Sequence, residues 1–180
     1  MIELIDVNYR VAEYAILTEI NLKVHKGECI LLAGESGSGK TTLTKLINGL
    51  IPHFYSCGRL DGGVCIQGVP VAEARMYKLA EKIGNVFQNP KSQFFYTDSS
   101  AEIAFGLENR GVPPEKIRQR IVTTANDLGI ENLLGRNIFK LSGGEKQIIA
   151  FASAYAVEPE IYVLDEPSSN LDNTSVERLK

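Results

Sequence analysis

One stretch of the chain has the residue types and spacing of a phosphate-binding loop. It follows an apolar run and reads Gly34-Glu35-Ser36-Gly37-Ser38-Gly39-Lys40-Thr41, with Thr42 next. Glycines let successive backbone N–H groups turn toward phosphate oxygens without Cβ collisions. The Lys40 ammonium group can bind β- and γ-phosphates, and the Thr41 hydroxyl can ligate Mg²⁺. We therefore predict that residues 34–42 bind a nucleoside triphosphate.

Two adjacent carboxylates, Asp165 and Glu166, follow a second apolar run, Ile161–Leu164. In a phosphate-loop enzyme the first carboxylate at a strand end holds Mg²⁺ through its coordination shell. The next one can polarise the attacking water. We predict the first role for Asp165 and the second for Glu166.

A second glycine-rich helix start lies at Ser142, Gly143 and Gly144. Ser142 and Glu145 have the spacing of a capping box. Adjacent glycines in a first helical turn destabilise it by roughly 1 kcal/mol each relative to Ala, so a purely structural cap would not need them. Bare N–H groups at a helix N-terminus form an anion site. The chain thus carries two predicted phosphate-binding helix starts.

The apolar patterns predict strands and helices at both ends of the chain, with a helical insert between them. Strands are expected at residues 2–9, 20–24, 29–33, 64–66, 83–87 and 161–164. Helices are expected at residues 41–50, 100–109, 116–128 and 142–157. The run at 29–33 and the run at 161–164 have the composition of fully buried strands. This order indicates an α/β fold with a mostly parallel sheet.

The composition fits one soluble globular domain. The 180 residues are 44% hydrophobic and 23% charged, with a net charge of −3. The acidic balance argues against nucleic acid as the main partner. No signal peptide is recognised, and the longest apolar stretch is shorter than the roughly 20 residues that cross a bilayer. Three cysteines, Cys29, Cys57 and Cys65, have no metal-ligand spacing.

The order of these motifs closely resembles that of the ATP-binding-cassette (ABC) ATPases. Gln88, residues 141–147, the Asp165–Glu166 pair and residues 169–172 carry the resemblance over nearly the whole chain. It implies a P-loop NTPase (RecA-like) core of residues 1–87 and 158–180, with an antiparallel β part near the N-terminus. Residues 88–157 would form an inserted helical subdomain.

The resemblance also implies residue roles. Gln88 would touch Mg²⁺ and the attacking water, and Tyr9 would stack on adenine, with Tyr14 as the alternative. Residues 169–172 would cross a dimer interface. In the family two ATPase domains pair head to tail, so Ser142, Gly143 and Gly144 would contact the γ-phosphate held by the opposite domain.

Within the family, three stretches resemble the energy-coupling-factor (ECF) transporters of vitamins and metal ions. They are residues 49–55, residues 87–95 and residues 102–109. The resemblance implies an ATP-hydrolysing subunit, peripheral at the cytoplasmic face of the cell membrane. It would bind a transmembrane coupling subunit of a micronutrient importer, and no nucleic acid.

One element of the family pattern is not found. The family's histidine beyond residues 169–172 is absent, and His25 and His53 lie far upstream. We therefore expect a C-terminally incomplete domain that binds nucleotide and hydrolyses it slowly by itself. Two alternatives remain: a soluble ABC machine acting on nucleic acid or ribosomes, and a non-catalytic nucleotide-binding fragment.

Overall fold

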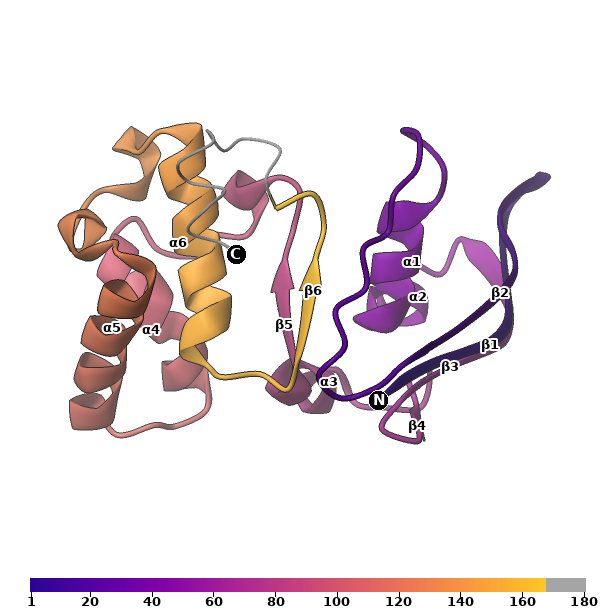
Figure 1. Ribbon diagram of the computed structural model, residues 1–180, viewed down its shortest axis with the longest axis horizontal. Coiled ribbons are helices and arrows are strands. Elements are labelled where there is room, and N and C mark those ends of the chain that lie inside the picture. Colours follow the sequence, from indigo (N-terminus) through magenta and orange to yellow (C-terminus); the bar gives the residue numbers. More distant parts are fainter. Residues whose placement is uncertain (168–180) are drawn as a thin grey trace. The chain divides into compact units, whose positions relative to one another are not determined.

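The computed structural model describes residues 1–167, and the chain divides into two compact units, Met1–Ile83 and Gly84–Lys180. The N-terminal unit is built on an antiparallel sheet in the order β2-β1-β3-β4 (Figure 1). Its strands are β1 (Ile2–Val11), β2 (Tyr14–Val24), β3 (Gly58–Ile66) and β4 (Val69–Pro70). Its helices are α1 (Lys40–Ile47), α2 (Leu50–His53) and α3 (Met76–Lys82).

Alternation along β1 decides which face of this sheet is buried. Ile2, Leu4, Val7 and Tyr9 are each at most 8% exposed. The period changes between Leu4 and Val7, where the register with β2 shifts, because a bulge moves the next side chain to the same face. Helix α1 contributes buried Leu43, Leu46 and Ile47 to the core of this unit.

The C-terminal unit combines a two-stranded sheet with three main helices. Strand β5 (Ile83–Val86) pairs with β6 (Ile161–Leu164), and Figure 1 shows both arrows pointing the same way. The helices are α4 (Ser99–Asn109), α5 (Pro114–Leu128) and α6 (Gly143–Ala156). Short 3₁₀ turns lie at η1 (Pro90–Ser92), η2 (Glu131–Leu133) and η3 (Ile138–Lys140).

Helix α6 is the centre of this unit because it is apolar on two faces. One face packs into the helical core with α4 and α5 through Ile148, Ile149, Ala152 and Ala156. The other face packs on β5, where Ala150 and Ala154 meet Val86. Small residues on that face let helix and strand approach closely.

The α/β character and the helical insert were predicted correctly, and most boundaries agree within a few residues. Two strands are longer than expected, since β2 begins at Tyr14 and β3 at Gly58. The predicted helix at residues 41–50 ends earlier, because α1 stops at Ile47 and Gly49 adopts φ +80° before α2. The division into residues 1–87, 88–157 and 158–180 stays a prediction.

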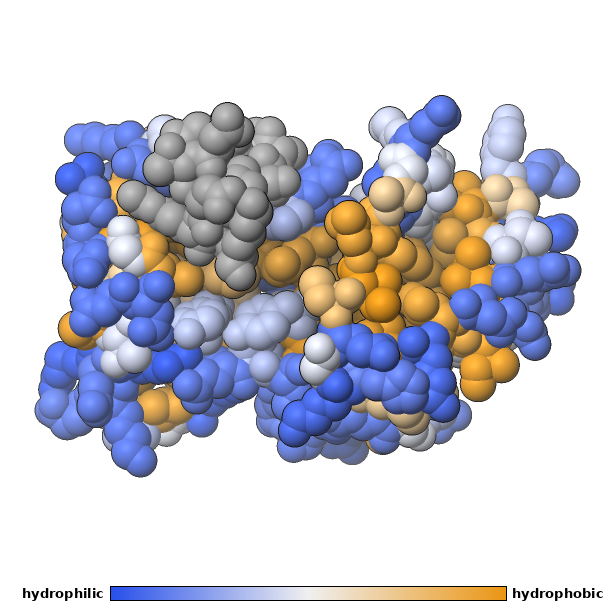
Figure 2. All heavy atoms as spheres, viewed as in Figure 1, coloured by the Kyte–Doolittle hydropathy of each residue, from blue (hydrophilic) through white to orange (hydrophobic). Residues whose placement is uncertain are grey.

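The predicted buried strand at residues 29–33 is wrong for this structure. These residues form no strand, and Ile30, Leu31 and Leu32 are 47%, 89% and 37% exposed. An apolar run becomes a strand only where a neighbouring strand takes its backbone hydrogen bonds. The strands of the N-terminal unit pair among themselves and offer this run none. Figure 2 shows hydrophobic surface on the N-terminal unit.

Among the described residues, no helix combines the length and apolarity that crossing a membrane requires.

Candidate functional site

The phosphate loop closes around the Lys40 ammonium group. Lys40 Nζ donates to the carbonyl oxygens of Gly34 and Glu35, both at 2.8 Å, and lies 3.5 Å from Ser38 Oγ. A turn from Ser38 N to Glu35 O, 3.2 Å long, shapes the loop. Residues 34–38 are exposed, including the predicted Ser36. The loop therefore presents a fixed positive charge at its centre and its backbone to solvent.

Gly39 connects the loop to α1 and requires a glycine. Its φ is +91°, which L side chains rarely adopt, and a Cβ there would lie 3.0 Å from Ile16 O and 2.9 Å from Leu17 Cδ2. The loop thus packs directly on β2. This contact fixes where α1 begins.

The first turn of α1 is open to an anion. Gly39 caps the helix without any side-chain hydrogen bond, so no side chain of the cap occupies the first N–H groups of α1. The half-buried Thr41 and Thr42 lie in this turn. Free N–H groups, the positive end of the helix dipole and Lys40 together suit the phosphates of a nucleotide.

In the C-terminal unit, the structure brings Gln88 and Glu166 together at the carboxyl ends of β5 and β6. Gln88 Nε2 donates to Glu166 Oε2 at 2.7 Å, and both side chains are exposed. The neighbouring Asp165 is 8% exposed, and its N–H donates to Val86 O at 2.9 Å. The backbone of Asp165 is therefore held by the sheet, whereas the exposed Gln88 and Glu166 side chains are held by each other.

The predicted Mg²⁺ ligands fit the ion by their chemistry. Mg²⁺ takes oxygen ligands, usually one or two from protein carboxylates and hydroxyls, with phosphate and water completing the octahedron. Asp165 offers a buried carboxylate, Gln88 an amide oxygen and Thr41 a hydroxyl in the first turn of α1. Thr41 belongs to the N-terminal unit and the other two to the C-terminal unit.

Ser142 and Glu145 form the predicted capping box at the start of α6. Glu145 N donates to Ser142 Oγ at 3.2 Å, and Ser142 N donates to Glu145 Oε2 at 2.7 Å. Hydrogen bonds from the Ser142 backbone N–H and side chain to the Glu145 carboxyl lower the pKa of Glu145. Ser142 and Gly143 are exposed and Gly144 is half-buried.

Tyr9 cannot stack on adenine in this structure, which corrects the first choice for that role. It is 3% exposed, and a Cβ on Gly58 would lie 2.3 Å from its ring, so the ring fills the space that this glycine leaves. Tyr14 is 75% exposed. It lies on β2 two residues before Ile16, the residue that Gly39 contacts. Tyr14, the alternative, is thus an exposed aromatic residue two positions from the contact between Gly39 and β2.

The segment after Gln88 contains residues that the sequence analysis left without a role. Gln93 bridges β5, because Phe87 N donates to its Oε1 at 3.2 Å and its Nε2 donates to Asn85 O at 3.1 Å. Glu102 is 3% exposed, and its Oε2 accepts from Phe95 N at 2.9 Å and Tyr96 N at 2.8 Å. A charged residue at a core position of a helix was the signal that could have identified Glu102.

These contacts hold an aromatic surface made of Phe95, Tyr96 and Phe105. The rings of Phe95 and Phe105 stack at 4.4 Å, and Tyr96 meets Phe105 edge-on at 5.9 Å. Phe95 is 74% exposed and Tyr96 40% exposed. Exposed aromatic side chains gathered on a folded support are typical of protein interfaces.

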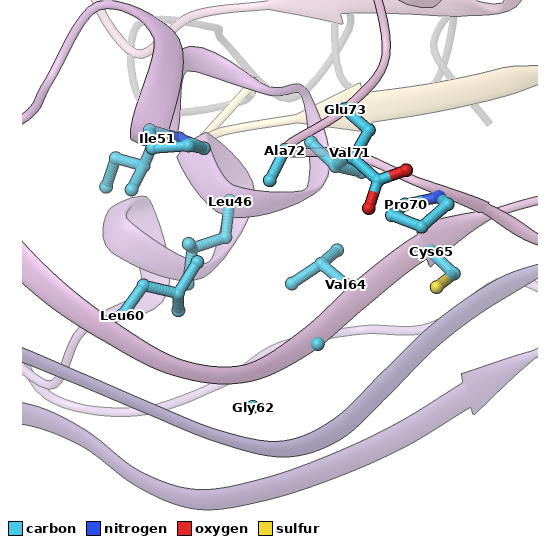
Figure 3. Close-up of a pocket in the computed structure, with 12 residues that line it drawn as sticks. Leu46, Ile51, Leu60, Gly62, Val64, Cys65, Pro70, Val71, Ala72 and Glu73 are labelled. Carbon is cyan, nitrogen blue, oxygen red and sulfur yellow. The ribbon is translucent and has the colours of Figure 1, made fainter.

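A pocket of about 260 Å³ lies in the N-terminal unit between β3 and helices α1 and α2 (Figure 3). Leu46, Ile51 and Val64 line it, and Glu73 is the one charged residue on its wall. The exposed His53 lies beside it, with Nε2 at 3.0 Å from Val71 O. This apolar lining is unsuited to phosphates, so the pocket is no part of the predicted nucleotide site.

Comparison with protein families decides the identity of the chain. The ABC transporter family matches residues 17–169. The chain belongs to the ABC transporter family. ABC ATPases typically hydrolyse ATP, so the predicted nucleotide and the phosphate-loop chemistry agree with the family.

Two curated relatives show how much of a protein the chain represents. It is 56% identical over 163 residues to a Treponema denticola protein named as an ABC transporter ATP-binding protein, covering 91% of the chain and 33% of the relative. It is 39% identical to the energy-coupling factor transporter ATP-binding protein EcfA1 of Halalkalibacterium halodurans, covering 96% of the chain and 60% of the relative. The chain spans about a third of the length of the first curated relatives it matches.

Solved structures confirm the fold as the P-loop NTPase α/β fold of ABC ATPases. The cbiO1 protein of Clostridium perfringens, described as part of the ABC transporter complex cbiONQ, matches with a TM-score of 0.83 at 30% identity over 99% of the chain and 70% of that structure. The dimeric ATP-binding cassette MJ0796 bound to ADP and Pi matches with a TM-score of 0.84 at 26% identity over 99% of the chain and 79% of that structure. The predicted interface residues 169–172 lie outside the described residues.

Proposed function

We propose that this ABC protein is the ATP-hydrolysing motor of an ECF-type membrane importer that carries a vitamin or a metal ion. The observation that carries the proposal is the aromatic surface that Glu102 holds after Gln88. It links the residues predicted to sense the nucleotide to a surface suited to a protein partner. Relatives named for energy-coupling factor and for the cbiONQ complex support this choice.

ATP binds through the phosphate loop in this proposal. Backbone N–H groups at Gly37, Ser38 and Gly39 and the Lys40 ammonium group hold the phosphates, and Tyr14 stacks on adenine. The open first turn of α1 supports this role, since α1 has no side chain on its N-terminal cap. The closeness of Tyr14 to the Gly39 contact on β2 supports the adenine site.

Thr41, Gln88 and Asp165 would hold Mg²⁺, which when bound would supply positive charge to the transferred phosphate. Glu166 accepts the proton of the attacking water. In the structure Gln88 donates to Oε2, one of the two carboxylate oxygens of Glu166. Gln88 would turn away from Glu166 to reach Mg²⁺.

A second ATPase domain completes the site at the start of α6. Ser142, Gly143 and Gly144 give the γ-phosphate of the opposite domain a hydroxyl proton and helix N–H groups. Their exposure and the geometry of the capping box support this arrangement. The dimeric form in which MJ0796 was solved with ADP and Pi also supports it.

The membrane partner binds the surface of Phe95, Tyr96 and Phe105. Two hydrogen bonds from Glu102 Oε2 fix the backbone of this segment, so a displacement of Gln88 is passed to rings that contact the partner. This is how ATP binding would reach the transmembrane subunit. No nucleic acid is involved in this proposal.

Co-purification of the protein with its candidate transmembrane subunit tests the proposal. We expect Phe95→Ala/Tyr96→Ala to lose partner binding and partner-stimulated turnover while keeping nucleotide binding. Tyr77→Ala is the matched control, because Tyr77 is also an exposed aromatic residue, at 54%, but lies on α3. Equal loss in both variants, or association with ribosomes in place of a membrane subunit, would overturn the proposal.

A further inference from the structure

Gln147 is a fully buried amide that has no hydrogen-bond partner within residues 1–167. It is 0% exposed, and neither its Oε1 nor its Nε2 has a partner among the described residues. Burying both ends of an amide unpaired carries the desolvation cost of each group. An apolar residue of similar length would fill the same space without that cost. A fold alone therefore gives no reason for glutamine at this position.

The position of Gln147 on α6 indicates what it faces. Ala150 and Ala154 lie three and seven residues further along the helix, on the stripe that packs against β5. A Cβ on Gly84 would lie 3.4 Å from Ala154 O, and Val86 packs with Ala150. The helix and the strand thus run in opposite directions, as Figure 1 shows.

Continuing this register brings Gln147 to the residues that follow β5. One helical turn covers about the same length as two strand residues, so the stripe from Ala154 through Ala150 to Gln147 continues along Gly84 and Val86 to Gln88. The 3₁₀ turn η1, which begins two residues after Gln88, packs on α6. Gln147 lies between the predicted Mg²⁺ ligand Gln88 and the helix start at Ser142.

We propose that Gln147 is a positioning residue for Gln88. When Gln88 leaves Glu166 to reach Mg²⁺, the backbone from Phe87 to Asn89 shifts, and the Gln147 amide forms hydrogen bonds with it. The amide suits this role because it carries both a donor and an acceptor. The unpaired Gln147 amide destabilises the state in which Gln88 contacts Glu166. Its hydrogen bonds form only when Gln88 has moved to Mg²⁺, so Gln147 shifts the equilibrium toward that second state.

This role of Gln147 rests on the role of Gln88 in the proposed function but not on any membrane partner. An experiment can therefore contradict the role of Gln147 without contradicting the importer function, and the reverse. The test compares Gln147→Met, which keeps length and removes polarity, with Thr124→Val. Thr124 is the matched control, because its Oγ1 is also buried and unpaired, but it lies on α5. Both variants are made in the Glu166→Gln background, so that bound ATP is not consumed.

Three readouts are measured for each variant. We expect Gln147→Met to raise the Tm by about 2–4 °C. We expect ATP affinity without Mg²⁺ to stay unchanged, while the gain in affinity that Mg²⁺ gives falls by about 2–10-fold. Hydrogen exchange of the amides from Phe87 to Ser92, slowed by Mg²⁺ and ATP in the parent, should no longer slow in Gln147→Met. Thr124→Val should raise the Tm and leave the other two readouts at the parent values.

A fall in Tm for Gln147→Met would show that the residue serves the fold and would overturn the proposal. A Mg²⁺-dependent gain and a protection of residues 87–92 equal to those of the parent would also overturn it. The proposal is also overturned if Mg²⁺ changes neither the ATP affinity nor the protection of residues 87–92 in the parent protein.

Discussion

Gln88 Nε2 lies 2.7 Å from Glu166 Oε2, which joins two residues 78 positions apart in the chain. Both side chains were predicted to act on the attacking water. In the structure they also contact each other, since Gln88 donates to one of the two carboxylate oxygens of Glu166. A carboxylate has further acceptor sites, so this bond leaves Glu166 able to accept a hydrogen bond from water as well.

We expect Glu166→Gln to lower kcat about 100–10,000-fold, the usual contribution of a general base. The amide oxygen that replaces Oε2 can still accept from Gln88, so the local geometry should persist and the dissociation constant of ATP should remain at the parent value. Phosphate release and equilibrium nucleotide binding measure the two effects. Glu131→Gln is the control, since Glu131 is an exposed carboxylate in η2 of the same unit. A variant that loses binding together with turnover would contradict the assignment.

Tyr14→Ala should weaken ATP binding about 5–100-fold, the range that loss of one aromatic stacking partner gives. The reason is its 75% exposure on β2, close to the contact between Gly39 and Ile16. Inorganic triphosphate has no base to stack, so its affinity should not change. Binding of both ligands can be measured by calorimetry. If triphosphate and ATP weaken equally, Tyr14 acts on the loop and not on adenine.

Gly39→Ala and Gly37→Ala separate backbone strain from collision. Both glycines have a positive φ, +91° and +83°, which costs an L residue roughly 1–2 kcal/mol. A Cβ at Gly37 meets nothing within 4 Å, whereas one at Gly39 meets Ile16 O and Leu17 Cδ2. We therefore expect Gly37→Ala to lose only the strain and Gly39→Ala about 2–5 kcal/mol of unfolding free energy. Urea denaturation measures both, and equal losses would refute the packing of the loop on β2.

The sequence was sufficient for features that depend on short-range chemistry. The capping box of Ser142 and Glu145 needs only residues three apart on one helix. The apolar run Ile161–Leu164 was identified from composition and forms β6, which has β5 as its neighbour. The pair Gln88 and Glu166 was partly predictable. The order of motifs identified both residues as site residues, but their hydrogen bond became visible only in the folded structure. Tyr9 and Tyr14 show what the local sequence does not tell. Either tyrosine could have been the exposed one until the register of β1 was known.

Features that depend on a partner element were not predictable from local pattern. Residues 29–33 have the composition of a buried strand, yet a strand also needs a neighbour for its hydrogen bonds, and composition carries no information about that neighbour. Glu102 and Gln147 are polar residues in helices whose burial follows from packing against β5 and the segment after it. Their side chains become informative only when burial and hydrogen bonds can be compared.

Arg120 should stabilise the C-terminal unit by binding the end of α6. It donates from Nε to Ala156 O at 2.8 Å and from Nη2 to Tyr155 O at 3.1 Å, and it pairs with Glu158 at 2.9 Å. Arg120→Met keeps the apolar stem and removes these bonds, so we expect a loss of about 1.5–3 kcal/mol in unfolding free energy. Arg118→Met is the control, because Arg118 is exposed and pairs with the exposed Glu115, and the substitution should change stability by less than about 0.5 kcal/mol. Chemical denaturation should separate the two variants clearly; similar losses would mean that the bonds from Arg120 to the end of α6 add no stability beyond that of an exposed ion pair.

The capping box at the start of α6 should make stability depend on pH through Glu145. Backbone and side-chain hydrogen bonds with Ser142 hold the pKa of Glu145 below its ordinary value of 4.5. A carboxyl group whose pKa is lowered in the folded state stabilises the fold above its unfolded pKa. That stabilisation is lost as the pH falls through the lower, folded pKa. The difference in unfolding free energy between the parent and Glu145→Gln should therefore be full at neutral pH and shrink below the ordinary pKa of a glutamate.

Ser142→Ala should remove the other half of the box and cost about 0.5–2 kcal/mol at neutral pH. Ser142→Thr keeps the hydroxyl and should retain most of the stability, which makes it the matched control. Urea denaturation of the three variants across acidic and neutral pH measures the dependence. Since Glu145 loses its hydrogen bond with Oγ in Ser142→Ala, that variant should also show a weaker pH dependence than the parent. An unchanged pH profile would mean that the bond to the Ser142 backbone N–H, which alanine retains, accounts for the whole pKa shift.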